Sequence, residues 1–263
     1  MSLETAIFVA GNLAFAVLII LLIYRHAWRS FPFFLIYNLE CLAGSVLYFF
    51  VLRDWPHQAL HTYFYESVLD GALQFCVLVE LTWAIFRPYR KTLPPATAFV
   101  LGILIAIAGM AIWPFTEATA FAHLAHLHQW QLLGRLLQTD SILRVLFFLA
   151  LAGCSQLLSI GWKDRELQIA TGLGFYSLAS LTATMVHSHQ TAGPQYLLVD
   201  QFVAATYLCS LFYWIFSFAQ HEAERREFSP QMQSVLLAVA GAARSMRIAA
   251  TDSATSGRKN KRP

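Results

Sequence analysis

The sequence predicts an all-α membrane protein with seven transmembrane helices. Hydrophobic residues make up 57% of its 263 residues and charged residues only 13%, whereas soluble domains carry about 25% charged residues. Apolar stretches long enough to cross about 30 Å of hydrocarbon recur along the chain. Basic residues gather in alternate connections, as in multi-pass membrane proteins. The seven expected helices cover residues 5–24, 32–52, 63–86, 96–114, 141–162, 166–187 and 196–218.

The first two expected helices can be placed from their starts. The stretch 5–24 is preceded by Glu4 where a signal peptide has basic residues, and it is longer than the apolar core of a signal peptide. We therefore expect it to remain as the first transmembrane helix. Ser30 and Pro32 predict the start of the second helix, because serine can accept from free N–H groups and proline leaves no N–H unpaired there.

The fourth and fifth expected helices differ in polarity. The stretch 96–114 contains no ionisable residue. It is expected to face lipid or to mediate self-association through Gly102 and Ala106, because small residues four apart let helices approach closely. The fifth apolar stretch, 141–162, follows a less hydrophobic segment. Residues 124–139 are therefore expected to form an amphipathic extension outside the membrane.

The positions of lysine and arginine predict the orientation. Most of the 18 basic residues follow the first, third, fifth and seventh expected helices, and the side richer in basic residues faces the cytoplasm. We expect the N-terminus outside and the C-terminus in the cytoplasm. Residues 1–218 form the expected transmembrane domain, 219–250 a cytoplasmic segment with an amphipathic surface helix, and 251–263 a disordered basic tail. No basic face remains for nucleic acid.

The third expected helix carries a polar stripe. A carboxylate near the bilayer centre costs roughly 2.5–3.5 kcal/mol, yet this helix has three. At 100° per residue, its polar residues fall on one stripe about 120° wide, which should face the bundle interior. The stripe could form a proton path, a ligand site, a metal site or hydrogen bonds between helices. Its members are Glu66, Asp70, Gln74 and Glu80.

Other helices offer partners for this stripe. Asp140 and Arg144 are four residues apart with the acid first, the favourable order for an ion pair on a helix. Asp200 and Tyr207 share a face of the last helix, and Glu40 lies midway along the second. We expect an outward-opening polar cavity framed by the second, third, fifth and seventh helices. Its predicted interacting cluster consists of Glu66, Asp70, Asp140, Arg144 and Asp200.

Seven of the nine histidines fall in the expected outer half. Two of them lie four residues apart, a spacing that can hold a metal on a helix, which leaves zinc or copper open. A response to pH is the other interpretation, because imidazole titrates near neutral pH. No other cofactor is expected. The seven are the pair His57 and His61, followed by His123, His126, His128, His187 and His189.

Several kinds of chemistry are excluded by what the expected helices lack. All four lysines lie outside them, so no Schiff base with retinal can form within the membrane. No histidine lies at mid-membrane depth to ligate haem, and no GxSxG motif supports a serine nucleophile. The cysteines have no CxxC spacing and are expected as small packing residues without disulfides. They are Cys41, Cys76, Cys154 and Cys209.

Four segments carry a resemblance to known sequences. They are the turn into RSFPFFLIY, the segment YFYESVLDGAL, the exit ELTWAIFRPY and the start TDSILRVL. Over about residues 1–220 the chain resembles a family of uncharacterised bacterial seven-helix integral membrane proteins. The resemblance implies the bacterial inner membrane and brings no activity or ligand.

These patterns leave three functions open. The first is a receptor-like or sensory protein that binds a small ligand or senses pH in the outer cavity and signals through a cytoplasmic partner. The second is a small proton-coupled transporter that uses Glu40 and Glu80 as well as the outer acids. No internal repeat is established, which counts against transport. The third is a membrane enzyme with an outer metal site, and a non-enzymatic role is favoured over it.

Overall fold

The structure is a computed structural model of the chain and describes residues 3–85, 97–116, 128–153, 164–189 and 194–220. Within these residues every regular element is helical, with short 3-10 turns between or beside the α-helices. This part of the all-α prediction is confirmed. The α-helices are α1 (Leu3–Tyr24), α2 (Pro32–Asp54), α3 (Ala59–Ile85), α4 (Thr97–Ile112), α5 (His128–Gly153), α6 (Arg165–His189) and α7 (Pro194–Ala219). The 3-10 turns are Ala27–Arg29, Pro56–Gln58 and Trp113–Phe115.

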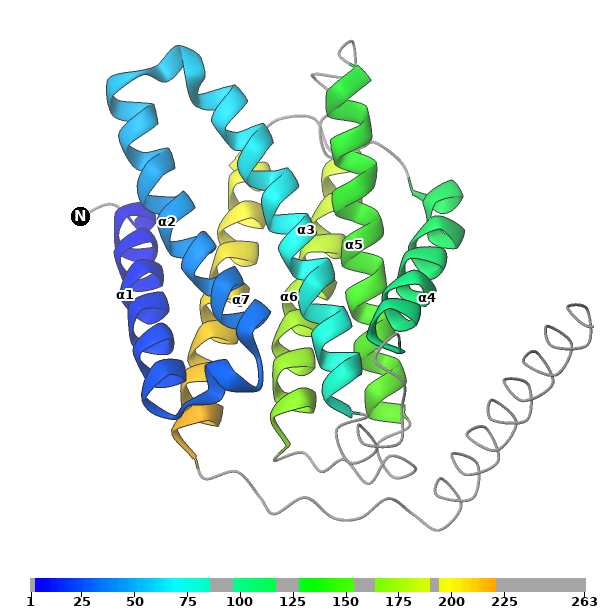
Figure 1. Cartoon of the computed structure of the whole chain (residues 1–263). Coiled ribbons are helices and arrows are strands. Elements are labelled where there is room, and N and C mark those ends of the chain that lie inside the picture. The colour runs from blue at the N-terminus through cyan, green and yellow to red at the C-terminus, as the bar shows by residue number, and fades with distance from the viewer. Residues whose placement is uncertain (1–2, 86–96, 117–127, 154–163, 190–193, 221–263) are drawn as a thin grey trace, which may run out of the picture.

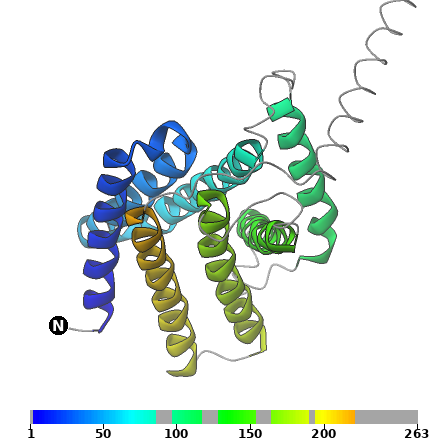
Figure 2. The same cartoon turned by 90° about the horizontal axis from the view of Figure 1, so that it is seen from below.

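Six of these helices form a closed ring. Around it, α1 packs against α2, α2 against α3, α3 against α5, α5 against α6, α6 against α7, and α7 again against α1. The helix α4 lies outside the ring against α3 and α5 (Figure 1). Seen from below, α1, α7 and α6 stand side by side, and α4 lies beyond α5 (Figure 2). The ring therefore encloses an interior to which α4 does not contribute.

The helices identify a multi-pass membrane protein. Six of the described helices, all those of the ring, are long and apolar enough to cross a membrane. With 16 residues, α4 is shorter and spans about 24 Å at 1.5 Å per residue. Soluble proteins rarely expose large contiguous apolar patches, yet many large apolar side chains face outward here, among them Ile20 (66%), Met185 (69%) and Phe216 (65%). A lipid environment accounts for that surface.

The helix α5 includes most of the predicted extension. Residues 124–139 were expected outside the membrane; the described helix begins at His128, and its span candidate among the described residues is Trp130–Gly153. Within this segment Thr139 is buried inside the bundle. The location of the extension outside the membrane stays a prediction. The predicted cytoplasmic helix and tail lie outside the described residues.

One half of the ring is tightly packed, and we call it the closed half. It carries the α1–α2 connection and the end of α7, and its core is built from large side chains. Phe34 meets Trp214 edge to face with ring centroids 5.1 Å apart, and both are 0% exposed. Aromatic pairs in this geometry contribute about 0.5–1.5 kcal/mol beyond their burial. Others packed there are Leu18, Leu22, Phe31, Leu78, Leu81 and Phe218.

A hydrogen bond ties the α1–α2 connection to the last turn of α7. Arg25 Nη2 donates to the Ala219 carbonyl at 2.6 Å. The final carbonyls of a helix have no partner within it and carry the negative end of its dipole, so an arginine there is favourable. Arg165, at the start of α6, lies with its guanidinium 5.2 Å from the ring centroid of Phe218. The end of α7 is thus held by two cationic side chains.

The small residues of α4 are used within the chain. A Cβ added to Gly102 would contact Val79 of α3 at 3.8 Å, and one added to Gly109 would contact Thr139 of α5 at 4.0 Å. Gly102 was expected to face lipid or a second chain. Instead, this face lets α4 lie close to α3 and α5. Its outward face is formed by Phe99, Val100, Ile103, Leu104, Ile107 and Met110.

Gly172 provides a test of the closed packing. A Cβ there would collide with the indole of Trp214, which is fully buried. We expect Gly172→Ala to destabilise the protein by about 1–3 kcal/mol through overpacking, although alanine by itself favours a helix by about 1 kcal/mol. The midpoint of thermal unfolding in detergent measures the effect. Gly11→Ala is the control, since no atom lies within 4 Å of the added Cβ. A larger loss for Gly11→Ala would contradict the packing.

Candidate functional site

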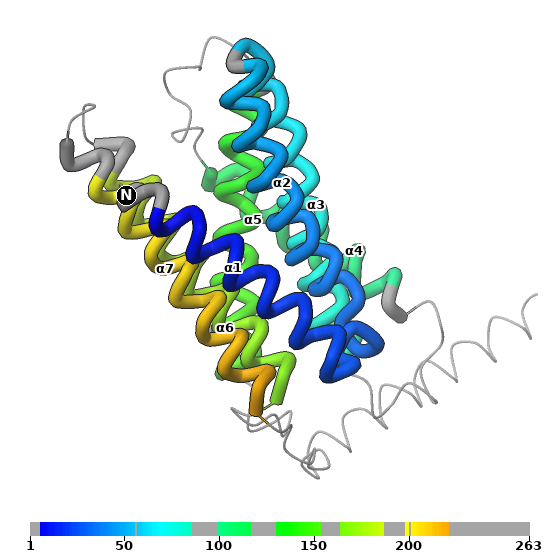
Figure 3. The backbone as a smooth tube through the Cα atoms, turned by 90° about the vertical axis from the view of Figure 1, so that its left-hand side faces the viewer, coloured from blue at the N-terminus to red at the C-terminus, as the bar shows by residue number. Residues whose placement is uncertain are grey.

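A cavity of about 680 Å³ lies inside the ring. Its lining comes from the six ring helices and occupies the half of the bundle that carries the α2–α3 connection, which we call the hollow half. Toward that end α1 and α7 separate from α2 and α3 (Figure 3). The predicted frame of four helices was therefore incomplete, because α1 and α6 also contribute. Polar side chains in the lining include Asn12, Tyr37, Glu40, Glu66, Asp70, Gln74, Gln138, Arg144, Tyr176 and Tyr207.

Three residues of the predicted α3 stripe line this cavity. Gln74 Nε2 donates to Asp70 Oδ2 at 2.7 Å and reaches the Tyr37 hydroxyl at 3.5 Å. The carboxyl of Glu66 lies directly against Gly44 of α2, where a side chain would take its place. Glycine at this position therefore lets an acidic group of α3 pack against the α2 backbone. The stripe faces inward, as its helical spacing predicted.

The predicted pair on α5 is present. Arg144 Nε lies 3.2 Å from Asp140 Oδ2, and Nη2 donates to the Ser141 hydroxyl at 3.0 Å. The guanidinium also lies 5.8 Å from the ring centroid of Tyr176. Arg144 is only 5% exposed and lines the cavity, yet its Nη1 has no hydrogen-bond partner among the described residues. One buried donor is therefore left for a bound molecule.

Aromatic side chains form part of the cavity wall. The predicted Tyr207 of α7 lies with its ring centroid 4.7 Å from that of Tyr176 on α6 and 5.7 Å from that of Phe15 on α1. All three line the cavity. Aromatic faces can contact apolar groups and can also attract cations. This wall is suited to the less polar part of a ligand.

Glu80, the fourth member of the stripe, has a different role. Its Oε1 accepts from the Phe33 N–H and its Oε2 from the Phe34 N–H, both at 2.9 Å. Because α2 begins at Pro32, these N–H groups belong to its first turn, where no helical acceptor exists. The carboxylate also meets the positive end of the helix dipole. Glu80 therefore caps α2 from α3 in the closed half and does not line the cavity.

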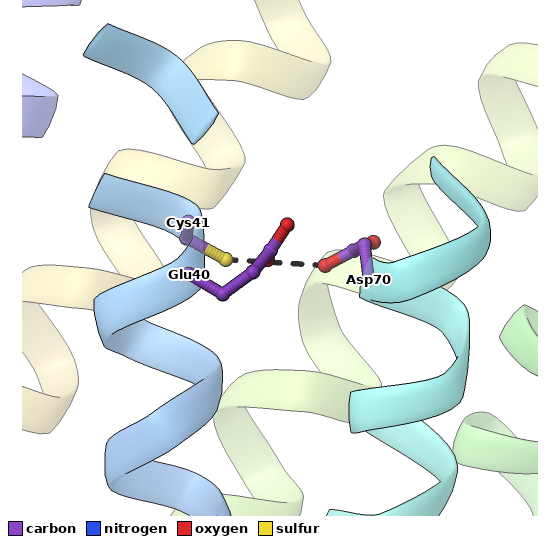
Figure 4. A group of neighbouring side chains, drawn as sticks. All are labelled: Glu40, Cys41 and Asp70. Atoms are coloured by element: carbon purple, nitrogen blue, oxygen red, sulfur yellow. Dashed lines mark hydrogen bonds between the residues drawn. The ribbon is translucent and has the colours of Figure 1, made fainter. Parts of the chain in front are cut away.

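A group of possible ligand atoms lies between α2 and α3. Glu40 and Cys41 of α2 reach toward Asp70 of α3 (Figure 4). The thiol or carboxylate atoms of the three lie within 4.8 Å of one another, and Cys41 Sγ is 3.9 Å from Asp70 Oδ1. Glu40 was predicted as a site residue. Cys41 was expected only as packing, so its place beside two acids is new.

The cavity carries more acidic than basic side chains. Arg144 is paired with Asp140, whereas Glu40, Glu66 and Asp70 have no ion pair in the described ranges. Carboxyl groups that line one cavity in a membrane interior cannot all stay charged at low cost without protons or a positive partner. The α2–α3 side is therefore the acidic side of the cavity.

The predicted five-residue cluster is present only in parts. Asp140 and Arg144 form one pair, whereas Asp70 bonds to Gln74 and Glu66 packs on α2. In the part of the chain that the structure describes, no hydrogen bond or ion pair joins the Asp140–Arg144 pair to Asp70 or Glu66. Glu66, Asp70 and Arg144 nevertheless line one cavity. The last member, Asp200, belongs to α7, but its side chain lies outside the description.

Of the seven predicted histidines, the structure describes the side chains of two. His57 lies in the turn Pro56–Gln58 and His61 near the start of α3, and both are exposed. Across the described ranges, the one group of three or more possible metal ligands contains no histidine. The predicted metal role of all seven histidines stays a prediction. His123 and His126 lie outside the described residues, as do the side chains of His128, His187 and His189.

No protein-family model, curated protein or solved structure matches the chain. The resemblance to bacterial seven-helix membrane proteins is therefore not extended to a family. An all-α protein with seven described helices, six of them membrane-span candidates, is what the structure supports.

Sequence reasoning missed the face that α2 turns to the cavity. Tyr37, Cys41, Ser45 and Tyr48 all line it. They are spaced three or four residues apart, so they share one helical face. That spacing was available in the sequence. It was overlooked because tyrosine, cysteine and serine are ordinary residues in membrane helices, whereas acids are not.

Arg144 should be essential for stability. Arg144→Leu leaves Asp140 buried without its partner, and breaking a buried ion pair on one side costs about 3–5 kcal/mol. We therefore expect a much lower unfolding midpoint and poor yield in detergent. Arg135→Leu is the control, because Arg135 lies on the same helix but is exposed. Equal and small effects of the two substitutions would contradict the buried pair.

Removal of the Glu80 cap should also be costly. Glu80→Gln replaces a charged acceptor of two N–H groups by an amide with one acceptor oxygen, and bonds to charged groups contribute about 1.5–3 kcal/mol. We expect a loss of that order in thermal unfolding. Glu40→Gln should leave the midpoint unchanged or raise it, since Glu40 has no basic partner within the described ranges. A larger drop of the unfolding midpoint in Glu40→Gln than in Glu80→Gln would be inconsistent with these roles.

Proposed function

We propose that the protein is a receptor-like or sensory membrane protein that binds a small polar ligand in its cavity and signals through a cytoplasmic partner. The observation that carries the proposal is the one-sided cavity, lined by six helices in the hollow half. Its volume of about 680 Å³ lies within the range of about 300–1,000 Å³ typical of ligand pockets.

The closed half supports binding rather than passage. A transporter needs a route that can open alternately to both sides of its central site. Below the cavity, Phe34, Leu81, Trp214 and Phe218 are at most 1% exposed and pack in one core cluster. Opening a path there would require separating these large side chains. A receptor needs only a change of helix packing around a closed end.

The role of Glu80 also favours a receptor over a proton-coupled transporter. A proton path was expected to need acids at several depths, and Glu80 was the acid nearest the cytoplasm in sequence. Both of its carboxylate oxygens are engaged by the first turn of α2. This carboxylate is therefore committed to a cap. The acids that remain available in the lining, Glu40, Glu66 and Asp70, gather in the hollow half.

The ligand is expected to combine polar and apolar parts. Arg144 Nη1 offers a buried donor and Asn12 Oδ1 a buried acceptor in the lining, neither with a partner among the described residues. A ligand that satisfies both would remove the cost of two buried unpaired groups, about 1–3 kcal/mol each. The rings of Phe15, Tyr176 and Tyr207 would cover its less polar face.

The proposal includes an orientation. The hollow half faces outward and the closed half faces the cytoplasm of a bacterial inner membrane, following the positions of lysine and arginine. The Arg25–Ala219 bond then lies on the cytoplasmic side and joins the α1–α2 connection to the end of α7. Residues 219–250 follow directly. A change in helix packing around a ligand can reach this segment, where a signalling partner would bind.

A panel of small molecules tests ligand binding. We expect at least one member of a set of amino acids, small carboxylates and small amines to raise the unfolding midpoint of the full chain in detergent. At 100 times its dissociation constant, a ligand stabilises by about 2.7 kcal/mol. Ser45→Leu should abolish the shift by filling the cavity. Ala43→Leu, an exposed position on the same helix, should retain it.

Vesicles separate the receptor from the transporter. With the full chain in sealed liposomes that contain a pH-sensitive dye, the stabilising compound should cause neither uptake nor proton movement. If the compound is taken up and Ser45→Leu abolishes that uptake, the protein is a transporter and the receptor proposal is wrong. A panel in which no compound shifts the midpoint, or in which both leucine variants keep the shift, would contradict a ligand site in this cavity.

A further inference from the structure

We propose that Glu40, Cys41 and Asp70 form a binding site for a zinc-class divalent metal ion at the α2–α3 side of the cavity. The three residues reach toward one point from two helices (Figure 4), and their ligand atoms lie within 4.8 Å of one another. This site is separate from the predicted histidine sites. It does not depend on whether the protein is a receptor.

The distances are close to those of a metal site. Zinc bonds of about 2.3 Å to sulfur and 2.0–2.2 Å to oxygen place tetrahedral sulfur and oxygen ligands roughly 3.6 Å apart. Cys41 Sγ lies 3.9 Å from Asp70 Oδ1. A movement of a few tenths of an ångström would bring these two atoms into range. The Glu40 carboxylate lies within 4.8 Å of both, so a rotation of its flexible side chain would complete the group.

A buried amide supplies an independent indication of a ligand. Gln74 is 3% exposed, lines the cavity, and donates from Nε2 to Asp70 Oδ2 at 2.7 Å. Its carbonyl Oε1, in the same amide that donates to this carboxylate, has no hydrogen-bond partner among the described residues. An unpaired buried carbonyl oxygen is costly in a membrane interior. A metal ion held by Asp70 would give it an electrostatic partner or a fourth coordination bond.

Charge and ligand type select the class of ion. The Cys41 thiolate and the carboxylates of Glu40 and Asp70 together carry three negative charges, of which a divalent ion balances two. A thiolate disfavours Mg²⁺ and Ca²⁺, which prefer oxygen, and favours Zn²⁺ and related transition metals. Cys41 must lose its proton for the metal to bind, so binding should release protons.

Cobalt provides the test, because a thiolate bound to Co²⁺ gives a charge-transfer absorption band. The full chain is purified in detergent without a histidine tag, stripped of metal, and titrated with Co²⁺. We expect one equivalent to produce the thiolate band together with the visible bands of a tetrahedral site, and Zn²⁺ to displace it. Cys41→Ser should remove the thiolate band. Asp70→Asn and Glu40→Gln should each weaken Co²⁺ binding by about tenfold or more.

Matched variants separate this site from others. Cys76→Ser and Cys209→Ser should keep the band, since neither cysteine belongs to the group. The double variant His57→Ala/His61→Ala should also keep it. A band that persists in Cys41→Ser, or that is lost in the histidine variant, would overturn the assignment. So would the absence of any thiolate band in the unsubstituted chain. If Cys41→Ser does not fold, the remaining variants decide: the assignment requires weaker Co²⁺ binding in Asp70→Asn and an unchanged thiolate band in both cysteine controls.

Discussion

The capping of α2 by Glu80 is the interaction on which the arrangement of the site depends. Two hydrogen bonds of 2.9 Å fix the first turn of α2 against α3. Because helices are stiff, this contact sets the register of the two along their length. Cys41 stands seven residues, about 10 Å, beyond Phe34, and Asp70 stands ten residues, about 15 Å, before Glu80. A slip of one residue at the cap would rotate these side chains out of contact. One carboxylate that caps α2 thus positions a thiol and a second carboxylate.

The division of the bundle into two halves follows from residue size. In the closed half, phenylalanine, leucine and tryptophan fill the ring, and Gly172 lets Trp214 lie directly on α6. In the hollow half, the same helices present smaller or polar residues, among them Gly44, Ser45 and Ser180, and the helices separate. The wall is densely packed at one end and encloses a cavity at the other.

Sequence alone predicted the helices well and the site in part. Helical periodicity placed Glu66, Asp70 and Gln74 inside, because a polar stripe has no other place in a membrane. Periodicity could not show that Glu80 caps a helix and does not line the cavity, because this role depends on the start of α2 lying beside it. Cys41 was missed because cysteine is an ordinary residue in membrane helices, and its position in the sequence does not indicate a polar contact with another helix. Such features depend on neighbours distant in sequence, which periodicity does not report.

The short helix outside the ring has a consequence for the surrounding lipid. At about 24 Å, α4 is shorter than a hydrocarbon layer of about 30 Å, whereas its neighbours α3 and α5 are not. Hydrophobic mismatch of this kind costs a fraction of a kcal/mol per ångström and is relieved by thinning the bilayer or tilting a helix. Because α4 packs against α3 and α5, a mismatch at α4 in a bilayer would act on the two helices that carry Asp70 and Arg144. Lipid composition would then influence the cavity from outside the protein.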